Sequence, residues 1–276
     1  DAAGFLSAES RGVLEAARVR LESGISLHED LALTLVRPDG EGRDVQLHVV
    51  RSSWDGHPAT IAMVQDVSER RRAEAQIADY IRQLTESIEG TLSTVSKMLD
   101  YRDPYTAGHE RRVGLIAADL GKEMGFDEAR CKWLMRAGLV HDIGKISIPA
   151  EILSKPTRLT DLEYGIIKAH AEAGYQILKD IPFPAPVAEI AHQHHERIDG
   201  SGYPQGLKGD AILIEARIVA VADVLESMGT HRPYRPARGL DAALEEIRLH
   251  RGTYYDADVV GALERLLARG DWRLPD

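Results

Sequence analysis

Apolar residues alternate with other residues in three short runs near the N-terminus. The runs are Leu31–Leu35, Val45–Val49 and Ile61–Val67. Pro38-Asp39-Gly40 and Asp55-Gly56 separate them, and alternation interrupted by Asp-Gly pairs is typical of antiparallel hairpins. We therefore predict part of a small antiparallel sheet, preceded by a short helical segment within residues 2–26.

The apolar spacing changes to that of a helix after Val67, and no proline interrupts it before Pro104. One row of positions, called the seam here, repeats every three or four residues. It consists of Ile77, Ile81, Leu84, Ile88, Val95 and Met98, and Thr91 occupies the place between Ile88 and Val95. Such a heptad seam predicts a helix over residues 69–99 that pairs with a second copy in a parallel coiled coil. The alternative is an ordinary amphipathic helix that packs on its own domain.

Helical spacing of apolar residues continues through most of residues 100–276. The helical segments are 113–124, 128–140, 161–178, 186–195, 211–228, 240–250 and 256–269. Prolines and glycines concentrate between them, as expected for loops. The predicted fold is therefore mainly α: an all-helical domain preceded by a long linker helix and a partial α+β segment.

Composition and charge restrict the class of protein. The net charge of −10 argues against binding a nucleic-acid polymer, because such binding needs a basic face. The single cysteine, Cys131, excludes an internal disulfide framework and suits a reducing compartment, so we expect a cytoplasmic location. Because the chain begins at Asp1 without a methionine, we expect a longer protein, in which a membrane anchor could precede Asp1.

Histidines and aspartates gather in the helical domain. Asp142 follows His141 directly, and Asp223 lies in an apolar helical run, where an unpaired carboxylate would be costly. Imidazole together with carboxylate suits first-row transition metals. The set is too large for one four-coordinate site, so we predict two metal ions that share a carboxylate. The histidines concerned, among 11 in the chain, are His109, His141, His170, His194 and His195.

Each of these residues also has a purely structural interpretation. A lone histidine such as His109 or His170 is more often a satisfied core residue than a ligand, and His192 fits the wall of the site. Asp223 could pair with Arg217. Adjacent His-Asp and His-His pairs, together with an acid in an apolar helix, are far harder to explain by packing alone.

Three stretches of the helical domain resemble motifs of one known family: HDIGK (141–145), HHERIDGSGYP (194–204) and RPYR (232–235). A fourth stretch, QDVSERR (65–71), follows the predicted strands and resembles part of another family. The first three, in this order, resemble the HD-GYP family, a branch of the HD-domain metal-dependent phosphohydrolases. This resemblance covers residues 100–276 and implies hydrolysis of the bacterial second messenger cyclic di-GMP. The fourth is similar to the end of a PAS sensory domain, so residues 1–68 resemble the C-terminal part of such a domain.

The HD-GYP resemblance implies roles for single residues. Asp142 would bridge two ions, and Lys145 matches a lysine that faces the metal centre and the scissile phosphate, which makes these two the catalytic residues. Tyr203, Arg232 and Arg235 match positions that contact the phosphates and bases of the substrate. The Gly-Tyr-Pro loop would let backbone approach the ligand closely. The implied metal ligands are His109, His141, Asp142, His170, His194, His195 and Asp223.

One position departs from the family pattern. Some members have a glutamate four residues before the first histidine ligand that helps to hold a third metal ion, whereas this chain has Tyr105 there. We therefore expect a binuclear centre, which the family pattern associates mainly with linear pGpG as product and less with complete cleavage to GMP. Iron or manganese are the expected metals, and nickel or zinc also suit the ligands.

Two other functions fit part of the pattern. An HD-type phosphohydrolase for another nucleotide would share the His-Asp pair. A weakly active module that binds metal or cyclic di-GMP could instead engage partner signalling proteins. In the preferred interpretation, the PAS-like segment and a homodimer formed through residues 69–99 regulate a cyclic di-GMP phosphodiesterase.

Overall fold

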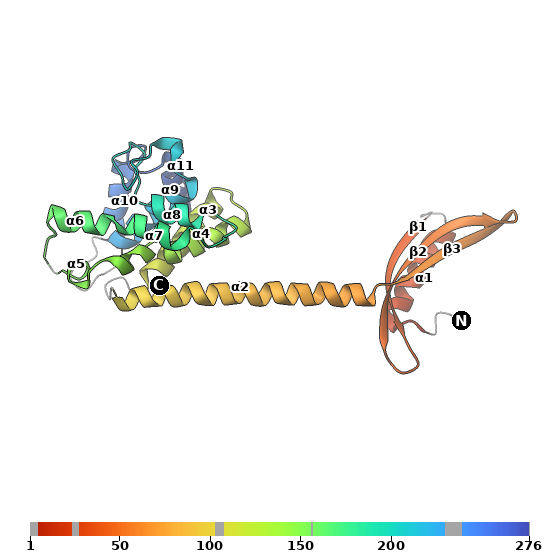
Figure 1. The fold of residues 1–276 in the computed structure, drawn as a ribbon. Coiled ribbons are helices and arrows are strands. Elements are labelled where there is room, and N and C mark those ends of the chain that lie inside the picture. The colour runs from red at the N-terminus through yellow and green to blue at the C-terminus, as the bar shows by residue number, and fades with distance from the viewer. Residues whose placement is uncertain (1–4, 24–27, 103–107, 156, 230–238, 276) are drawn as a thin grey trace. The chain divides into compact units, whose positions relative to one another are not determined.

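The computed structural model of the protein describes residues 5–23, 28–102, 108–155, 157–229 and 239–275. The chain forms two compact units, residues 1–86 and 87–276, and helix α2 (Ser68–Arg102) continues from one into the other (Figure 1). The mainly helical fold with a small N-terminal sheet confirms the predicted fold class. No helix in the described ranges is long and apolar enough to cross a membrane.

The first unit contains a three-stranded antiparallel sheet with a helix packed on one face. Both predicted hairpins are present: Leu33 pairs with Val45 across the first, and Asp55 turns the second with a positive φ of 49°. Alternating side chains of the strands, including Leu31, meet Ala17 of the helix in a small core. The elements are α1 (Ala8–Glu22), β1 (His28–Val36), β2 (Gly42–Trp54) and β3 (His57–Asp66).

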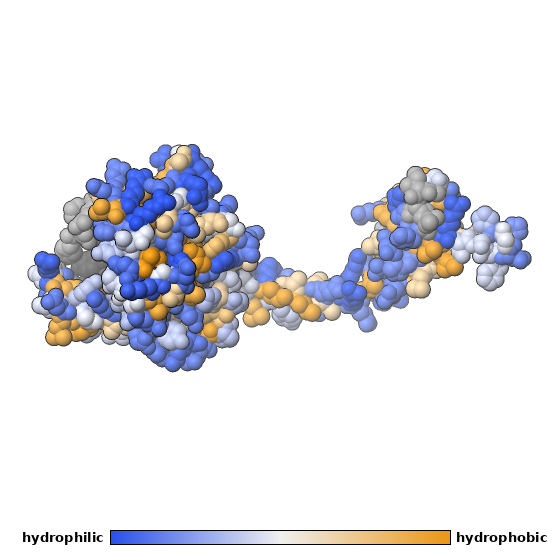
Figure 2. All heavy atoms as spheres, turned by 90° about the horizontal axis from the view of Figure 1, so that it is seen from above, coloured by the Kyte–Doolittle hydropathy of each residue, from blue (hydrophilic) through white to orange (hydrophobic). Residues whose placement is uncertain are grey.

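Helix α2 has two differently packed parts. Leu92 and Leu99 are buried in the core of the second unit, and Val95 packs against that core. The earlier apolar positions remain exposed, and Figure 2 shows apolar patches on the surface of this helix. Packing on its own domain, which the sequence left as an alternative, therefore holds for the last turns of α2. The exposed positions are Ile77, Ile81, Leu84 and Ile88.

The second unit is a bundle of helices around one aliphatic core. Ile116, Leu134, Ile190 and Ile218 come from different helices and are each almost completely buried in this core. The elements are α3 (His109–Glu123), α4 (Glu128–Val140), η3 (Ile143–Ser147), α5 (Ala150–Leu153), α6 (Asp161–Lys168), α7 (His170–Leu178), α8 (Val187–Gln193), η4 (Gly209–Ala211), α9 (Ile214–Gly229), α10 (Leu240–Leu249) and α11 (Ala257–Ala268).

Helices α3 and α4 approach each other closely through two glycines. A Cβ atom on Gly138 would lie 2.4 Å from Cα of Gly114, and one on Gly114 would lie 2.4 Å from the Met135 carbonyl oxygen. Only glycine permits such an approach of two backbones. This contact brings the start of α3 and the end of α4 together, so that the rings of His109 and His141 lie 5.6 Å apart, centroid to centroid.

The single helix predicted for residues 161–178 is wrong, because the structure has two helices, α6 and α7, that meet at Ala169. The Ala169 N–H bonds to the carbonyl of Ile166, three residues back, in place of the usual partner four residues back. The ring of His170 donates from Nδ1 to the carbonyl of Ile167 at 2.7 Å. This competing hydrogen bond redirects the chain and turns His170 inward.

Candidate metal centre

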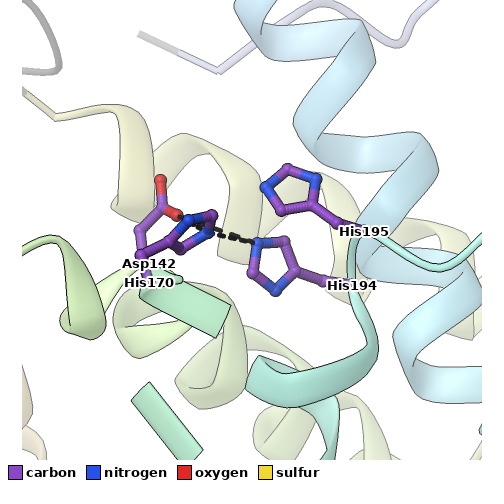
Figure 3. Close-up of side chains that lie close together, drawn as sticks. All are labelled: Asp142, His170, His194 and His195. Carbon is purple, nitrogen blue, oxygen red and sulfur yellow. Dashed lines mark hydrogen bonds and ion pairs between the residues drawn. The ribbon is translucent and has the colours of Figure 1, made fainter. Parts of the chain in front are cut away.

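The predicted ligands come from five separate places in the helical unit. His109 begins α3, His141 and Asp142 follow the end of α4, and His170 begins α7. His194 and His195 follow α8, and Asp223 lies within α9. In Figure 3, the carboxylate of Asp142 and the rings of His170, His194 and His195 point toward one another. The end of a helix suits adjacent ligands, because the chain leaves helical geometry there.

Among the described residues, two groups of ligand atoms lie close enough to hold metal ions. One consists of Asp142, His170, His194 and His195, and the other of His109, His141 and Asp142, with the ligand atoms of each group within 4.8 Å of one another. Asp142 is common to both groups. Asp223 lies outside this limit in both, but its Oδ1 is 3.2 Å from Nε2 of His109.

Backbone carbonyls fix the orientation of three of the rings. Nδ1 of His141 is 2.7 Å from the carbonyl oxygen of Gly138, and His194 contacts Ala191 in the same way. His170 makes the same contact with Ile167. Each of the three rings is therefore bound to the carbonyl three residues before it. Since a carbonyl only accepts, Nδ1 carries the proton in each ring and Nε2 presents a lone pair to the centre.

The resulting lone pairs face one another without a proton between them. Nε2 of His170 lies 3.4 Å from Nε2 of His194 and 3.2 Å from Oδ1 of Asp142. Oδ1 of Asp142 and Nε2 of His141 are buried and make no well-formed hydrogen bond. Buried acceptors that face each other are unfavourable unless a cation lies among them. The residues present therefore fit a metal centre.

Burial and neighbouring charges set the protonation of this cluster. Burial lowers the pKa of His141 to about 4 and holds the pKa of His195 well below its usual value, so both rings are neutral at physiological pH. Burial opposes the charged form of Asp142, yet Lys145 and His141 hold the pKa of its carboxyl well below the usual range. Neutral imidazoles and an ionised carboxylate are the forms that bind metals.

His109 is held by two acids, one of which the sequence analysis did not identify. Its Nδ1 contacts Oε2 of Glu226, which is buried on α9, and Arg112 binds the other oxygen of Glu226 at 2.7 Å. Burial would lower the pKa of His109, but Asp223 and Glu226 raise it to about 10, so positive charge is favoured between these carboxylates. The available signal was the three-residue spacing from Asp223 to Glu226, which places both on one face of a helix.

Lys145 and Asp142 form an ion pair at the edge of the cluster. Gly144 lies between them, and a Cβ atom there would lie 1.9 Å from the carbonyl oxygen of His170 and 2.5 Å from the backbone nitrogen of Gly174. Gly144 therefore lets η3 pack directly on α7 and brings Asp142 to His170.

The loop that follows His195 folds back on the centre. The Tyr203 ring stacks on His195 with centroids 4.7 Å apart. A Cβ atom on Gly202 would lie 2.4 Å from the Arg197 backbone nitrogen, so this glycine permits the close return of the loop. The buried Glu196 holds the loop by accepting hydrogen bonds from consecutive backbone N–H groups, those of Gln205, Gly206 and Leu207.

Two further residues from the sequence analysis have contacts in the structure, and three others lie outside the residues that it describes. His192 is buried, contacts Glu172 at 2.8 Å and stacks on Tyr175, as expected of a wall residue. Arg217 pairs with Asp210 and Asp256 rather than with Asp223, so that structural alternative for Asp223 is wrong. Tyr105, Arg232 and Arg235 lie outside the described residues.

Comparison with known proteins bears on the helical unit. A family model described as HD domain matches residues 93–259. Three relatives cover most of the chain at a similar level of identity. The response regulator RpfG of Xanthomonas campestris pv. campestris, named a cyclic di-GMP phosphodiesterase, is 39% identical over 206 residues, which are 73% of this chain and 54% of RpfG.

The second relative is a cyclic di-GMP phosphodiesterase of Thermotoga maritima, 39% identical over 195 residues, 70% of this chain and 53% of that protein. The third is the 3'3'-cGAMP-specific phosphodiesterase 3 of Vibrio cholerae, 36% identical over 180 residues, 65% of this chain and 39% of that protein. The chain thus spans about half the length, or less, of these relatives. Because the family model matches more than half of the chain, the chain belongs to the HD domain family.

Proposed function

We propose that the protein is a metal-dependent phosphodiesterase that hydrolyses a cyclic dinucleotide, with cyclic di-GMP as its substrate. The observation that carries the proposal is the pair of buried ligand groups that share Asp142. A phosphodiester needs compensation for the charge that develops on its oxygens, and such a centre supplies it. Relatives named cyclic di-GMP phosphodiesterases, at 39% identity, support the choice of substrate.

We assign the metal ligands to both groups together with Asp223. Asp142 belongs to both groups and would be shared by the two ions, and His109 and Asp223 would be held together on one side of the centre. When bound, two divalent cations lower the pKa of a water and stabilise negative charge on a phosphoryl oxygen. Imidazole with carboxylate fits iron or manganese first, and nickel or zinc as alternatives.

The protein's own side chains position the substrate and compensate its charge. Lys145 forms an ion pair with Asp142, and from there its ammonium group can stabilise the negative charge that develops on the scissile phosphate. Tyr203, stacked on His195, forms the edge of the pocket. Arg232 and Arg235 are proposed to hold the second phosphate or a guanine, since the guanidinium fork suits oxyanions and stacks on bases. With Tyr105 in place of a glutamate, two metals and the product linear pGpG are proposed.

A second substrate deserves a direct comparison, because one relative at 36% identity is named for 3'3'-cGAMP. Cyclic di-GMP and 3'3'-cGAMP have the same cyclic backbone with two phosphodiesters and differ in one base. The metal centre therefore does not discriminate between them. Steady-state rates on both substrates decide which one the protein prefers.

The experiment compares metal content and turnover in one set of proteins. The chain is loaded with iron or manganese without oxygen, and metal content is measured beside hydrolysis of cyclic di-GMP. His141→Ala and Asp142→Ala should each lose metal and at least about 10²-fold in turnover, as for removal of groups that organise a charged transition state. His57→Ala, which alters an exposed histidine of the first unit, is the matched control. Undiminished hydrolysis in a metal-free Asp142→Ala protein would falsify the assignment.

Regulation through the N-terminal residues is part of the same proposal. We propose that residues 1–68 are the C-terminal part of a PAS-like sensory domain, and residues 69–99 a helix that joins two copies and connects this domain to the phosphodiesterase domain of residues 100–276. The exposed apolar positions of α2 support this. The three-stranded sheet with α1 on one face is compatible with a partial domain of that kind.

A further inference from the structure

A lysine that has no acidic partner among the described residues lies beside the candidate metal centre. Lys168 is the last residue of α6, two positions before His170, and it is half-buried. Its Nζ atom lies 4.8 Å from the ring centroid of Tyr164 and 5.2 Å from that of Tyr203. The lysine is thus held between the faces of two aromatic rings from different parts of the chain.

Tyr203 connects this lysine to the metal ligands. Its ring stacks on His195 at an interplanar angle of 30° and meets His170 edge-on, with centroids 6.4 Å apart. Tyr203 itself is fixed by the loop that Glu196 holds. The ring of Tyr203 therefore contacts both the ammonium group of Lys168 and two of the predicted metal ligands, His170 and His195.

Within the described part of the chain, no acid compensates the charge of Lys168. Lys145 pairs with Asp142, and Lys155 pairs with Glu163 at 2.7 Å. For Lys168, no carboxylate of the described residues lies within ion-pair distance. Aromatic faces attract an ammonium group by only about 0.5–1 kcal/mol at accessible sites and accept none of its N–H groups strongly. The N–H donors of Lys168 thus remain available to an anion.

We propose that Lys168 binds the second phosphate of the cyclic dinucleotide, the one that is not cleaved, and that Tyr164 and Tyr203 position it. The inference rests on the proposed function, because it takes the dinucleotide as substrate. The metal centre and Lys145 compensate one phosphate, so the other requires a cation at a distance from them. Lys168 is such a cation.

A purely structural role makes different predictions from a substrate-binding role. If Lys168 only fastened α6 to the loop that carries Tyr203, its loss would disturb His195 and lower metal content and the turnover of every substrate. If it binds the second phosphate, its loss affects only substrates that have one. Bis(p-nitrophenyl) phosphate has a single phosphodiester, so its cleavage reports on the metal centre alone.

The test measures kcat and KM of metal-loaded Lys168→Met, Lys168→Arg and a matched control, Lys179→Met, which removes an exposed lysine at the end of α7. For Lys168→Met we expect KM for cyclic di-GMP to rise about tenfold, the effect of one lost charged hydrogen bond. Metal content, kcat and the cleavage of bis(p-nitrophenyl) phosphate should stay within twofold of the starting protein. Lys168→Arg should recover most of the affinity, and Lys179→Met should change nothing.

The outcomes separate this inference from the proposed function. An unchanged KM for cyclic di-GMP in Lys168→Met, with normal turnover in the starting protein, overturns the role of Lys168 and leaves the proposed function intact. Loss of metal, or equal losses on both substrates, also overturns it in favour of a structural role. A starting protein that cleaves bis(p-nitrophenyl) phosphate but no cyclic dinucleotide overturns the proposed function itself.

Discussion

At the scale of single residues, the contact between Glu226 and His109 explains how a proposed metal ligand at the start of a helix is oriented. A histidine that binds a metal through one nitrogen commonly donates its other N–H to a carboxylate, which fixes the ring and raises its basicity. Glu226 occupies that position, and burial, which would raise its pKa, is outweighed by His109 and Arg112, which lower it to about 2. The acid is therefore ionised throughout the physiological range.

Replacing this acid should weaken metal binding without removing a ligand. We expect Glu226→Gln to reduce metal affinity about 10- to 100-fold, as is usual for the loss of such a carboxylate. Competition with a chelator of known affinity measures this directly. Glu215→Gln, on the same helix but paired with Arg130, is the control and should leave affinity unchanged. Equal affinities in Glu226→Gln and the starting protein would show that His109 is oriented by other contacts.

Site residues were predictable when neighbouring residues in the sequence indicated their chemistry, and were missed when only a contact with a distant residue indicates it. His141-Asp142 and His194-His195 carry their signal in adjacent letters, so their chemistry was readable from the sequence. Glu226 carries only its three-residue spacing from Asp223, because an acid in a helix is ordinarily solvated, and its contact with a histidine 117 positions away shows what it does. Residues that act through a distant partner become visible only in the folded chain.

At the scale of elements, the packing of η3 on α7 brings the ligand groups together through Gly144. We expect Gly144→Ala to force these elements apart, because its Cβ would meet backbone atoms that cannot rotate away. Overpacking of this kind costs about 1–3 kcal/mol of the free energy of unfolding. Since Asp142 and His170 lie on the two sides of this contact, metal affinity should fall as well.

The matched control for this change is Gly165→Ala in α6. No atom lies within 4 Å of a Cβ placed there, and alanine is favoured over glycine inside a helix by about 0.5–1 kcal/mol. Urea unfolding of the metal-free proteins should therefore show opposite signs for the two substitutions. A Gly144→Ala protein with full stability and full metal affinity would contradict the proposed importance of the close approach.

Elements were predictable where local pattern and packing agree. The helix expected at residues 128–140 has the same bounds in the structure, and both hairpins form where alternation and Asp-Gly turns placed them. The break at Ala169 was not predictable, because residues 161–178 keep helical spacing across it. It accompanies the hydrogen bond from the His170 ring to the carbonyl of Ile167, a contact that apolar spacing does not encode.

At the scale of the whole molecule, an acidic protein that acts on an anion must confine its positive charge to the site. The chain carries a net charge of −10, so its average field repels a cyclic dinucleotide. In the proposed function, Lys145, Lys168, Arg232, Arg235 and the bound metal ions would supply the positive charge that acts against this field at close range. Binding therefore depends on contacts within the site, which is why the loss of one lysine is expected to be visible in KM.

The exposed seam of α2 makes a further prediction about assembly. Ile77, Ile81, Leu84 and Ile88 are 58%, 60%, 64% and 44% exposed in the single chain, and they repeat at heptad spacing. Val95 packs on the core of the second unit, so the seam available to a second copy ends before it. A row of large aliphatic side chains in water is unfavourable, and pairing with an identical row in a parallel coiled coil removes it from solvent.

We expect the chain to dimerise with an affinity that depends on this row. Leu84→Glu places a charge in the seam of both copies and removes side chains that contribute about 1.5–3 kcal/mol each when buried. The dimer dissociation constant, measured by sedimentation over a range of concentrations, should rise at least about tenfold. Gln83→Glu adds the same charge at an exposed neighbouring position outside the row and should have little effect. A chain that stays monomeric at all concentrations, or a Leu84→Glu protein that associates as before, would mean that this row is covered by something other than a second copy.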